Sequence, residues 1–394
     1  MEVTLTMAQV QRYEVVRAAL EGRMTNAEAA SALGRSIRQV QRLKRQVEAF
    51  GVRGVVHGNQ GREPANKTPD AIRNSVIELA MGELAEYNYA HLAETLAEEH
   101  RIRLSDETLR NWLRPLGHGA PVRRAKKHRR RRKRKAREGE MLFLDGSPHH
   151  WFGPEHPEAC LLLSSDDATG NPLRGKFVPA ENRDGYFEVC YHLFRKHGLP
   201  ASFYLDMGSQ FKTTRHGGQH VAQRTQQEDT QFQRAMHELG VGILFAHSPQ
   251  ARGRGERLNG SFQGRLVAEL KRAGITDCDA ATEYVNKKFI PRYAKTFGRE
   301  PADPQPAWRP VPAGMNLKHV LCAKYTRTVA NDNTIQFKAR SYQLTPPKAC
   351  YHLFRAKVEV QQWFDGSIHV WHPKHGMIRH KVIPSDRPQS EAAQ

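Results

Sequence analysis

Three acidic residues in the second half of the chain stand where carboxylates could do chemistry together. Asp145 and Asp206 each end a run with strand character, and Glu256 lies on a long basic helical segment. Ligands of open α/β sheets bind at the carboxyl ends of the strands, so these side chains can converge there. Three carboxylates at one point repel one another unless divalent cations such as Mg²⁺ or Mn²⁺ neutralise them. Two such ions about 4 Å apart can activate an attacking hydroxyl and stabilise the leaving oxygen at a phosphorus atom.

Each carboxylate also has an ordinary structural interpretation. Asp145 could be a turn residue, Asp206 a strand-end cap, and Glu256 an ion-pair partner of neighbouring arginines. Taken singly, the two interpretations of each residue are balanced. For Asp167, in a turn that ends at Gly170, the turn role is favoured because Asp and Gly are common turn residues.

A catalytic role for these carboxylates requires a sheet in which strands distant in the sequence become neighbours. From residue 140 the hydrophobic pattern predicts the order β-β-β-α-β-α-β-α. The expected strands span 141–147, 159–165, 172–179, 200–206 and 241–248, and the expected helices span 184–198, 230–240 and 250–274. We therefore predict an α/β core with a mixed five-stranded sheet over residues 139–300, in which the first and fourth strands lie side by side.

The first 60 residues carry the pattern of a helix-turn-helix DNA-binding unit. Thr25 and Glu28 have the spacing of a capping box that opens a short helix, and Ser36 begins a second helix after a turn at Gly34. Arg and Gln can hydrogen-bond guanine and adenine edges in the major groove. The second helix would present Arg38, Gln39, Gln41, Arg42 and Arg45. The alternative is a helical hairpin with a solvated basic face.

Residues 61–120 predict a second helical unit, of helix-turn-helix or winged-helix type. It opens at Thr68-Pro69, and Ser105 caps a later helix from which Arg110 and Arg114 would point outward to DNA. The acidic side chains of the helix between them are expected to face away from DNA; they are Glu94, Glu98 and Glu99.

A basic run separates these units from the core. Twelve of the fifteen residues from Arg123 to Arg137 are Lys or Arg, in a chain of 61 Lys+Arg, 41 Asp+Glu and formal charge +20. Such a run, here taken as a linker over 121–138, stays solvated and binds polyanions by counterion release. Arg130 and Arg132 are candidate phosphate contacts, and DNA or RNA are the candidate partners.

The remaining segments predict a second, smaller β module. Pro-rich residues 301–325 read as a linker, and alternating short strands over 326–385, with a hairpin at Asp365-Gly366, predict a small β-barrel. Whether this barrel binds DNA or is a structural cap stays open. The longest apolar stretch is far shorter than a membrane span, and no leader pattern opens the chain, so a cytoplasmic protein is expected.

Cysteine and histidine spacing gives little support to a metal centre of another kind. The five cysteines are scattered, which favours reduced thiols over a disulfide framework or structural zinc site. His216 and His220 have i, i+4 spacing, but the glycines between them break a helix. We expect a loop over 212–229 that contacts DNA rather than a zinc site.

Four motifs in order resemble those of DDE transposases, closest to the ISNCY insertion-sequence type, which are relatives of retroviral integrases. They are Leu144-Asp-Gly-Ser-Pro148 with Trp151, Asp166-Asp-Ala-Thr-Gly170, Tyr204-Leu-Asp-Met-Gly-Ser-Gln-Phe211, and Ser248-Pro-Gln-Ala-Arg-Gly-Arg-Gly-Glu-Arg257 with Asn259. The resemblance implies a ribonuclease-H-like core, two Mg²⁺ or Mn²⁺ ions, and Asp145, Asp206 and Glu256 as catalytic, metal-binding triad. It further implies strand cleavage and strand transfer on element ends and target DNA by a homo-oligomer.

Basic and amide groups around Glu256 are the expected DNA contacts of this core. They are Arg252, Arg254, Arg257 and Asn259, with Gln263 on the same helix face. The two amides could instead support the catalytic carboxylates, and a solvated face is the equal alternative for them. Gly255 and Met207 depart from the family pattern, which has a small aliphatic residue and often a basic residue there. The rival functions are a non-catalytic DNA-binding regulator that keeps the fold, and a plain metal-dependent nuclease.

Overall fold

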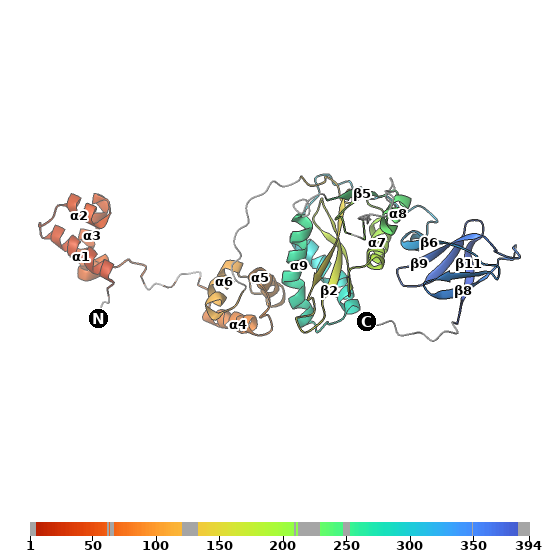
Figure 1. The fold of residues 1–394 in the computed structure, drawn as a ribbon. Coiled ribbons are helices and arrows are strands. Elements are labelled where there is room, and N and C mark those ends of the chain that lie inside the picture. Colours follow the sequence, from red (N-terminus) through yellow and green to blue (C-terminus); the bar gives the residue numbers. More distant parts are fainter. Residues whose placement is uncertain are drawn as a thin grey trace, which may run out of the picture. The chain divides into compact units, whose positions relative to one another are not determined.

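The computed structural model describes residues 5–60, 63, 67–119, 133–208, 210–211, 229–246, 253–348 and 350–384 (Figure 1). The chain divides into two compact units, Met1–Ser75 and Val76–Gln394. Five residues for which we predicted a site or a loop role lie outside the described residues; they are Arg130, Arg132, His216, His220 and Arg252.

The first unit is a bundle of three helices, which are α1 (Met7–Leu20), α2 (Asn26–Leu33) and α3 (Ile37–Phe50). Thr25 and Glu28 form the expected capping box at the start of α2, and Gly34 ends that helix in the left-handed conformation. Val40 of α3 is fully buried with Ala29 and Ala30 of α2. This packing confirms the predicted helix-turn-helix arrangement, to which the structure adds α1, a helix that the sequence analysis did not anticipate.

The core of the second unit is a five-stranded sheet in the order β3-β2-β1-β4-β5. Its strands are β1 (Leu142–His149), β2 (Ala159–Asp166), β3 (Pro172–Val178), β4 (Ser202–Leu205) and β5 (Gly242–Phe245). The first three strands form an antiparallel meander, whereas β4 is parallel to β1 and β5 is parallel to β4. This is the mixed, ribonuclease-H-like sheet expected from the sequence, with the first and fourth strands adjacent.

Helices cover both faces of this sheet, and strand periodicity decides which side chain meets which helix (Figure 1). Leu142, Leu144 and Leu162 pack in one cluster with helices α7 (Arg183–His197) and α8 (Gln231–Glu238). Leu161 and Leu163 point the other way and pack against helix α9 (Gly253–Arg272). Two further helices follow on that face, α10 (Cys278–Tyr284) and α11 (Ile290–Phe297), joined by a π-helical turn, Val285–Phe289.

A small helical subdomain packs against the far side of α9. It contains α4 (Asp70–Met81), α5 (Tyr89–Glu99) and α6 (Asp106–Leu113), and Ala268 of α9 joins its apolar cluster. The acidic helix α5 lies toward α9: Glu94 pairs with Arg265, and Glu99 accepts a hydrogen bond of 2.8 Å from Arg272. The acidic residues thus serve as partners of the basic helix α9.

The C-terminal sheet has six antiparallel strands in the order β6-β9-β10-β11-β8-β7, and it curls around its own core, as expected for a small barrel. The strands are β6 (Cys322–Thr328), β7 (Thr334–Phe337), β8 (Arg340–Thr345), β9 (Lys357–Trp363), β10 (Ile368–His372) and β11 (Gly376–Ile383). The segment 301–325, expected to be a linker, holds a short helix, α12 (Leu317–Val320), and packs on the core. Trp308 stacks on His197, and the Arg309 amide donates to the carbonyl oxygen of Leu199.

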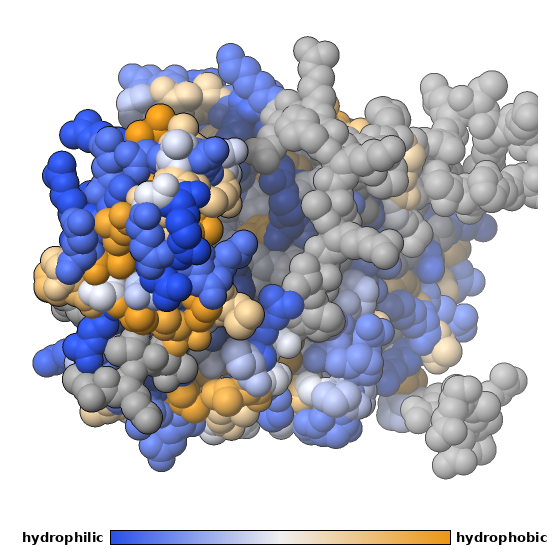
Figure 2. Space-filling model, turned by 90° about the vertical axis from the view of Figure 1, so that its left-hand side faces the viewer, coloured by the Kyte–Doolittle hydropathy of each residue, from blue (hydrophilic) through white to orange (hydrophobic). Residues whose placement is uncertain are grey.

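The part of the chain that the structure describes contains no helix long and apolar enough to cross a membrane. The face drawn in Figure 2 is largely hydrophilic, with hydrophobic residues in small separate patches. All five cysteines are free thiols, and three of them are buried, namely Cys160, Cys190 and Cys322.

Candidate active site

Two of the three predicted carboxylates meet on adjacent parallel strands. In the register between β1 and β4, Phe143 lies opposite Tyr204, so the next residues on the same face are Asp145 and Asp206. Both aspartates line one small cavity, together with Phe143 and Tyr204. Asp206 directly follows β4, as predicted, and its Oδ1 accepts a hydrogen bond of 2.9 Å from the Gly208 amide.

The prediction that Asp145 ends its strand is wrong, because β1 continues to His149. The strand continues because its next residues pair with β2 as far as Ala159, so Gly146 does not form a turn. The carboxylate of Asp145 therefore projects from the middle of β1, where α9 crosses the same face of the sheet.

Helix α9 presents two residues to Asp145, one turn apart. The Nδ2 atom of Asn259 donates a 3.1 Å hydrogen bond to Asp145 Oδ2. Gly255 also lines the aspartate cavity, and a Cβ atom added to it would lie 3.7 Å from the same oxygen. One turn further on, Gln263 Nε2 donates a 3.0 Å hydrogen bond to Ser147 Oγ. Asn259 and Gln263 therefore contact the strand rather than form a solvated face.

The third predicted carboxylate lies beside this cavity and not in it. Glu256 is exposed in the first turn of α9, and only its neighbour Gly255 lines the cavity. Among the described residues, no three His, Cys, Asp or Glu side chains are close enough to hold a metal ion. The structure thus brings Asp145 and Asp206 together, with Glu256 one residue away from the position that faces them.

The space around Gly255 allows a direct test of this packing. Gly in a helix interior costs about 1 kcal/mol relative to Ala, and 3.7 Å is an ordinary van der Waals distance. We expect Gly255→Ala to raise the free energy of unfolding by about 0.5–1 kcal/mol, measured by urea denaturation. Gly260→Ala is the matched control, because no atom lies within 4 Å of its added Cβ. A loss of stability in Gly255→Ala alone would mean that α9 lies closer to Asp145 than described.

Asp167 has a larger structural role than the turn role favoured by its sequence. Its side chain is fully buried and forms an ion pair with Arg254, in the first turn of α9. Its Oδ2 also accepts a 2.8 Å hydrogen bond from the Lys135 amide. Asp167 therefore fixes the start of the helix that carries Glu256 to the core. The sequence signal for this role was the second aspartate of Asp166-Asp167. One aspartate is enough to close the turn, so the other was available for a different contact.

The neighbouring Asp166 is a buried structural carboxylate. Burial raises its pKa, although hydrogen bonds from the Thr169 and Gly139 amides act in the opposite direction. These bonds close the turn between β2 and β3 and hold residue 139 against it. Asp166 thus organises the turn.

The predicted DNA-binding residues of the helical units differ in how free their side chains are. On α3, Arg38, Gln41, Arg42 and Arg45 are exposed. Gln39 is exposed too, but its Oε1 accepts a 3.1 Å hydrogen bond from the Ser36 amide and closes a second capping box. On α6, Arg110 is half-buried and pairs with Glu107. Arg114 is exposed at the end of that helix, as predicted.

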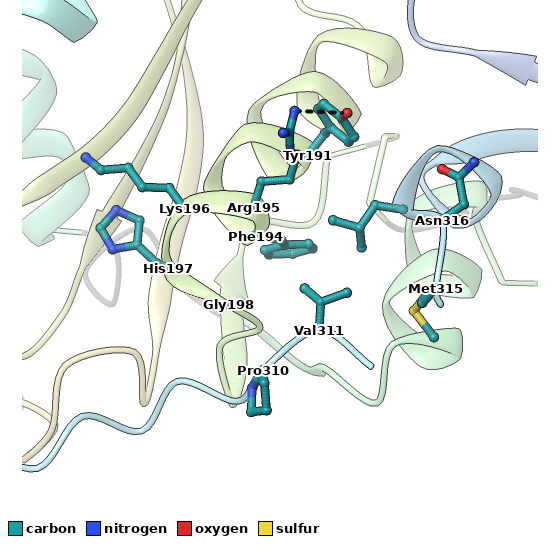
Figure 3. Close-up of a pocket in the computed structure, with 11 residues that line it drawn as sticks. Tyr191, Phe194, Arg195, Lys196, His197, Gly198, Pro310, Val311, Met315 and Asn316 are labelled. Carbon is teal, nitrogen blue, oxygen red and sulfur yellow. Dashed lines mark hydrogen bonds between the residues drawn. The ribbon is translucent and has the colours of Figure 1, made fainter. Parts of the chain in front are cut away.

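A larger cavity of about 710 Å³ lies at the C-terminal end of α7 (Figure 3). Phe194 and Val311 point into it, and a hydrogen bond of 3.3 Å joins Arg195 to the Tyr191 hydroxyl at its edge. Its lining contains basic and apolar side chains and no carboxylate. It therefore does not offer the oxygen ligands that the predicted chemistry requires.

Comparisons with known proteins bear on the family of this chain. Residues 11–63 match a helix-turn-helix domain family. The chain is 32% identical over 395 residues to the transposase y4bF of Sinorhizobium fredii, covering 99% of this chain and 84% of that protein. It is 30% identical over 401 residues to the transposase of insertion sequence IS1202 from Streptococcus pneumoniae, covering 92% of this chain and 84% of that protein.

Similarity to solved structures is weaker. A chain of the simian T-cell lymphotropic virus intasome has 13% identity and a TM-score of 0.31, with 78% of this chain and 96% of that chain covered. At that score the likeness carries no argument about this chain. Two transposases are at least 30% identical to this chain over more than nine tenths of its length and 84% of their own, and the chain has the helix-turn-helix unit and the mixed sheet. On this evidence the chain belongs to the family of insertion-sequence transposases.

Proposed function

We propose that this protein binds the ends of its own insertion sequence and catalyses metal-dependent strand cleavage and strand transfer with Asp145, Asp206 and Glu256. The observation that carries the proposal is that Asp145 on β1 and Asp206, directly after the adjacent parallel strand β4, line one cavity. Two carboxylates held side by side repel each other, and a divalent cation bound between them would relieve that repulsion. Their placement therefore favours chemistry over a purely structural role.

Two of the three carboxylates at this site are placed to bind a divalent cation, and the third lies beside them. Asp145 and Asp206 offer the hard oxygen donors that Mg²⁺ and Mn²⁺ prefer, and both line the same cavity. Glu256 is exposed one residue from Gly255, and we propose that it joins the two aspartates when DNA is bound. When bound, the cations would activate the attacking oxygen and stabilise the leaving oxygen at phosphorus.

The other residues of the site would position these carboxylates. Asn259 donates to Asp145 Oδ2 and so helps to fix the rotamer of that carboxylate. Asp167 pairs with Arg254 and holds the first turn of α9, on which Glu256 lies. Arg257 is exposed on the same turn and can contact phosphate.

The proposal is tested by strand transfer in vitro with labelled DNA from the ends of the element. We expect joined products in Mg²⁺ or Mn²⁺ and none in EDTA. Glu256→Gln should reduce product by at least about a hundredfold in either metal, with Glu300→Gln, another exposed acid of the core, as the control. Full activity of Glu256→Gln would remove Glu256 from the triad and leave the two aspartates.

The exposure of Glu256 favours one rival, a DNA-binding regulator that has kept the fold and lost the chemistry. The same assay separates the two functions. Specific binding of element ends without cleavage in either metal would establish the regulator and refute the transposase activity of this chain.

Recognition of the element ends is expected to depend on α3. A bidentate contact from an arginine to a base contributes about 1–3 kcal/mol, and Arg42 is exposed on α3. Arg42→Ala should therefore weaken binding to end DNA by about ten- to a hundredfold, while binding to unrelated DNA changes by less than about threefold. The control is Arg17→Ala on α1, where the arginine pairs with Glu21. Equal losses on both DNAs for Arg42→Ala would mean that it contacts phosphate.

A further inference from the structure

A second cavity on the α9 side of the core gathers four arginines. Its volume is about 270 Å³, and the four guanidinium groups that line it come from three parts of the chain. Arg134 lies near the end of the basic run, Arg254 and Arg257 lie on the first turns of α9, and Arg299 follows α11. These three parts are far apart in the sequence, so the positive charge of the cavity is assembled by the fold.

Among the described residues that line the cavity, Asp166 is the one carboxylate, and the neighbouring Asp167 pairs with one of the arginines; both are engaged in the fold. Asp166 lines the cavity, but its oxygens accept hydrogen bonds from the Gly139 amide and from the amide and hydroxyl of Thr169. Asp167 forms its ion pair with Arg254. Four guanidinium groups against two carboxylates leave a surplus of positive charge, because arginine stays protonated in proteins.

The arginine side chains also repel one another electrostatically. Burial lowers the pKa of Arg134, and repulsion from Arg254 and Arg299 lowers it further, whereas Asp167 acts in the opposite direction. Arg134 is held in place: its Nη1 donates a 2.6 Å hydrogen bond to the Asp167 carbonyl oxygen. Arg134 and Arg254 are thus partly buried and held in place, and the guanidinium groups around the cavity suit an oxyanion with several acceptor oxygens.

The cavity adjoins the aspartate pair. Phe143 lines both cavities and precedes Asp145 by two residues on the same face of β1, which is about 7 Å along a strand. A strand of DNA that runs from the aspartates along this face of the core would therefore come within reach of the four arginines. Arg257 and Arg299 are exposed and form its open side.

We propose that this four-arginine cavity binds one backbone phosphate of the DNA strand whose neighbouring phosphodiester lies at Asp145 and Asp206. The site would set which bond along the strand reaches the aspartates, so Arg134 and Arg299 act as positioning residues. This inference rests on the proposed function, because the phosphate is that of DNA in the same site.

The test measures binding of the full-length protein to end duplexes that each carry one neutral methylphosphonate, in EDTA so that no cleavage occurs. For the wild-type protein we expect one position at which the methylphosphonate weakens binding about tenfold. For Arg299→Gln, binding to unmodified DNA falls about tenfold and the methylphosphonate at that position has no further effect. Arg257→Gln should show the same coupling. Lys287→Gln, which removes another exposed cation from the core, should retain the full tenfold effect.

Additive effects at every position for both arginine variants would overturn the proposal. A second result would also overturn it: inorganic phosphate raises the melting temperature of the wild-type protein but not that of Arg299→Gln, while the effects on DNA binding remain additive. The cavity would then bind free phosphate and not DNA. Neither result bears on the aspartates, because this assay contains no metal and measures no cleavage. Loss of strand transfer in the aspartate variants would stand whatever the outcome here.

Discussion

Asp145→Asn and Asp206→Asn are each expected to reduce strand cleavage and strand transfer by at least about a hundredfold, with binding of element ends changed by less than about threefold. An amide keeps the shape of the carboxylate but removes the charge that a divalent cation requires. We propose that end recognition depends on α3 in the first unit, which contains neither residue. The measurement is a strand-transfer assay beside a gel-shift assay, on the same preparations and the same labelled DNA.

The control for both variants is Asp279→Asn, which makes the same acid-to-amide change at an exposed position of α10. It should transfer strands like the wild-type protein. Activity that persists in one aspartate variant would remove that residue from the site. Loss of end binding together with activity would indicate a folding defect rather than a catalytic one.

Glu269→Gln is expected to lower the free energy of unfolding by about 3 kcal/mol, because it breaks a buried charge network between α9 and its neighbours. Glu269 lies 2.9 Å from His91 Nε2 of α5, accepts a 2.9 Å hydrogen bond from the Tyr284 hydroxyl, and pairs with Arg292. Both Glu269 and His91 are buried. Removing the carboxylate charge leaves these partners uncompensated. All five tryptophans of the chain lie beyond residue 75, so urea denaturation followed by fluorescence reports on this unit.

The difference in the free energy of unfolding between the wild-type protein and Glu269→Gln should depend on pH in a defined direction. Burial acts to raise the pKa of Glu269, but the His91 hydrogen bond and the charge of Arg292 outweigh it, so the pKa is lowered on folding. A lowered carboxyl pKa stabilises the fold above the unfolded value of about 4.3, and this stabilisation is lost as the pH falls through the folded value. The difference in the free energy of unfolding between wild type and Glu269→Gln should therefore be largest at pH 7 and decrease below about pH 4. Glu283→Gln, an exposed pair partner of Lys287, should leave the midpoint unchanged. A gap that grows on acidification would contradict the assigned direction.

The local elements were predictable because their signals are local. The capping box at Thr25, the helix that ends at Gly198 and the hairpin at Asp365-Gly366 all appear where the sequence places them. The adjacency of Asp145 and Asp206 followed from strand order, since β1 and β4 had to be parallel neighbours for the two residues to converge. Helix α1 also has a local signal, the capping box of Thr6 and Gln9, but the helix buries only Val16 and Ala19, so no regular apolar stripe follows that cap and the helix was not anticipated.

The sequence by itself determined the family motifs, the order of strands and helices, and the two aspartates as neighbours on the first and fourth strands. Only the tertiary structure decided how α9 is rotated on the sheet. Spacing puts Gly255, Asn259 and Glu256 on neighbouring parts of one helix, but it does not say which of them faces Asp145. That rotation depends on distant partners: Asp167 holds the start of the helix, and Glu94 and His91 of α5 hold its far end. Burial and ion pairing between segments that are far apart in sequence leave no local pattern, so they appear only when the chain is folded.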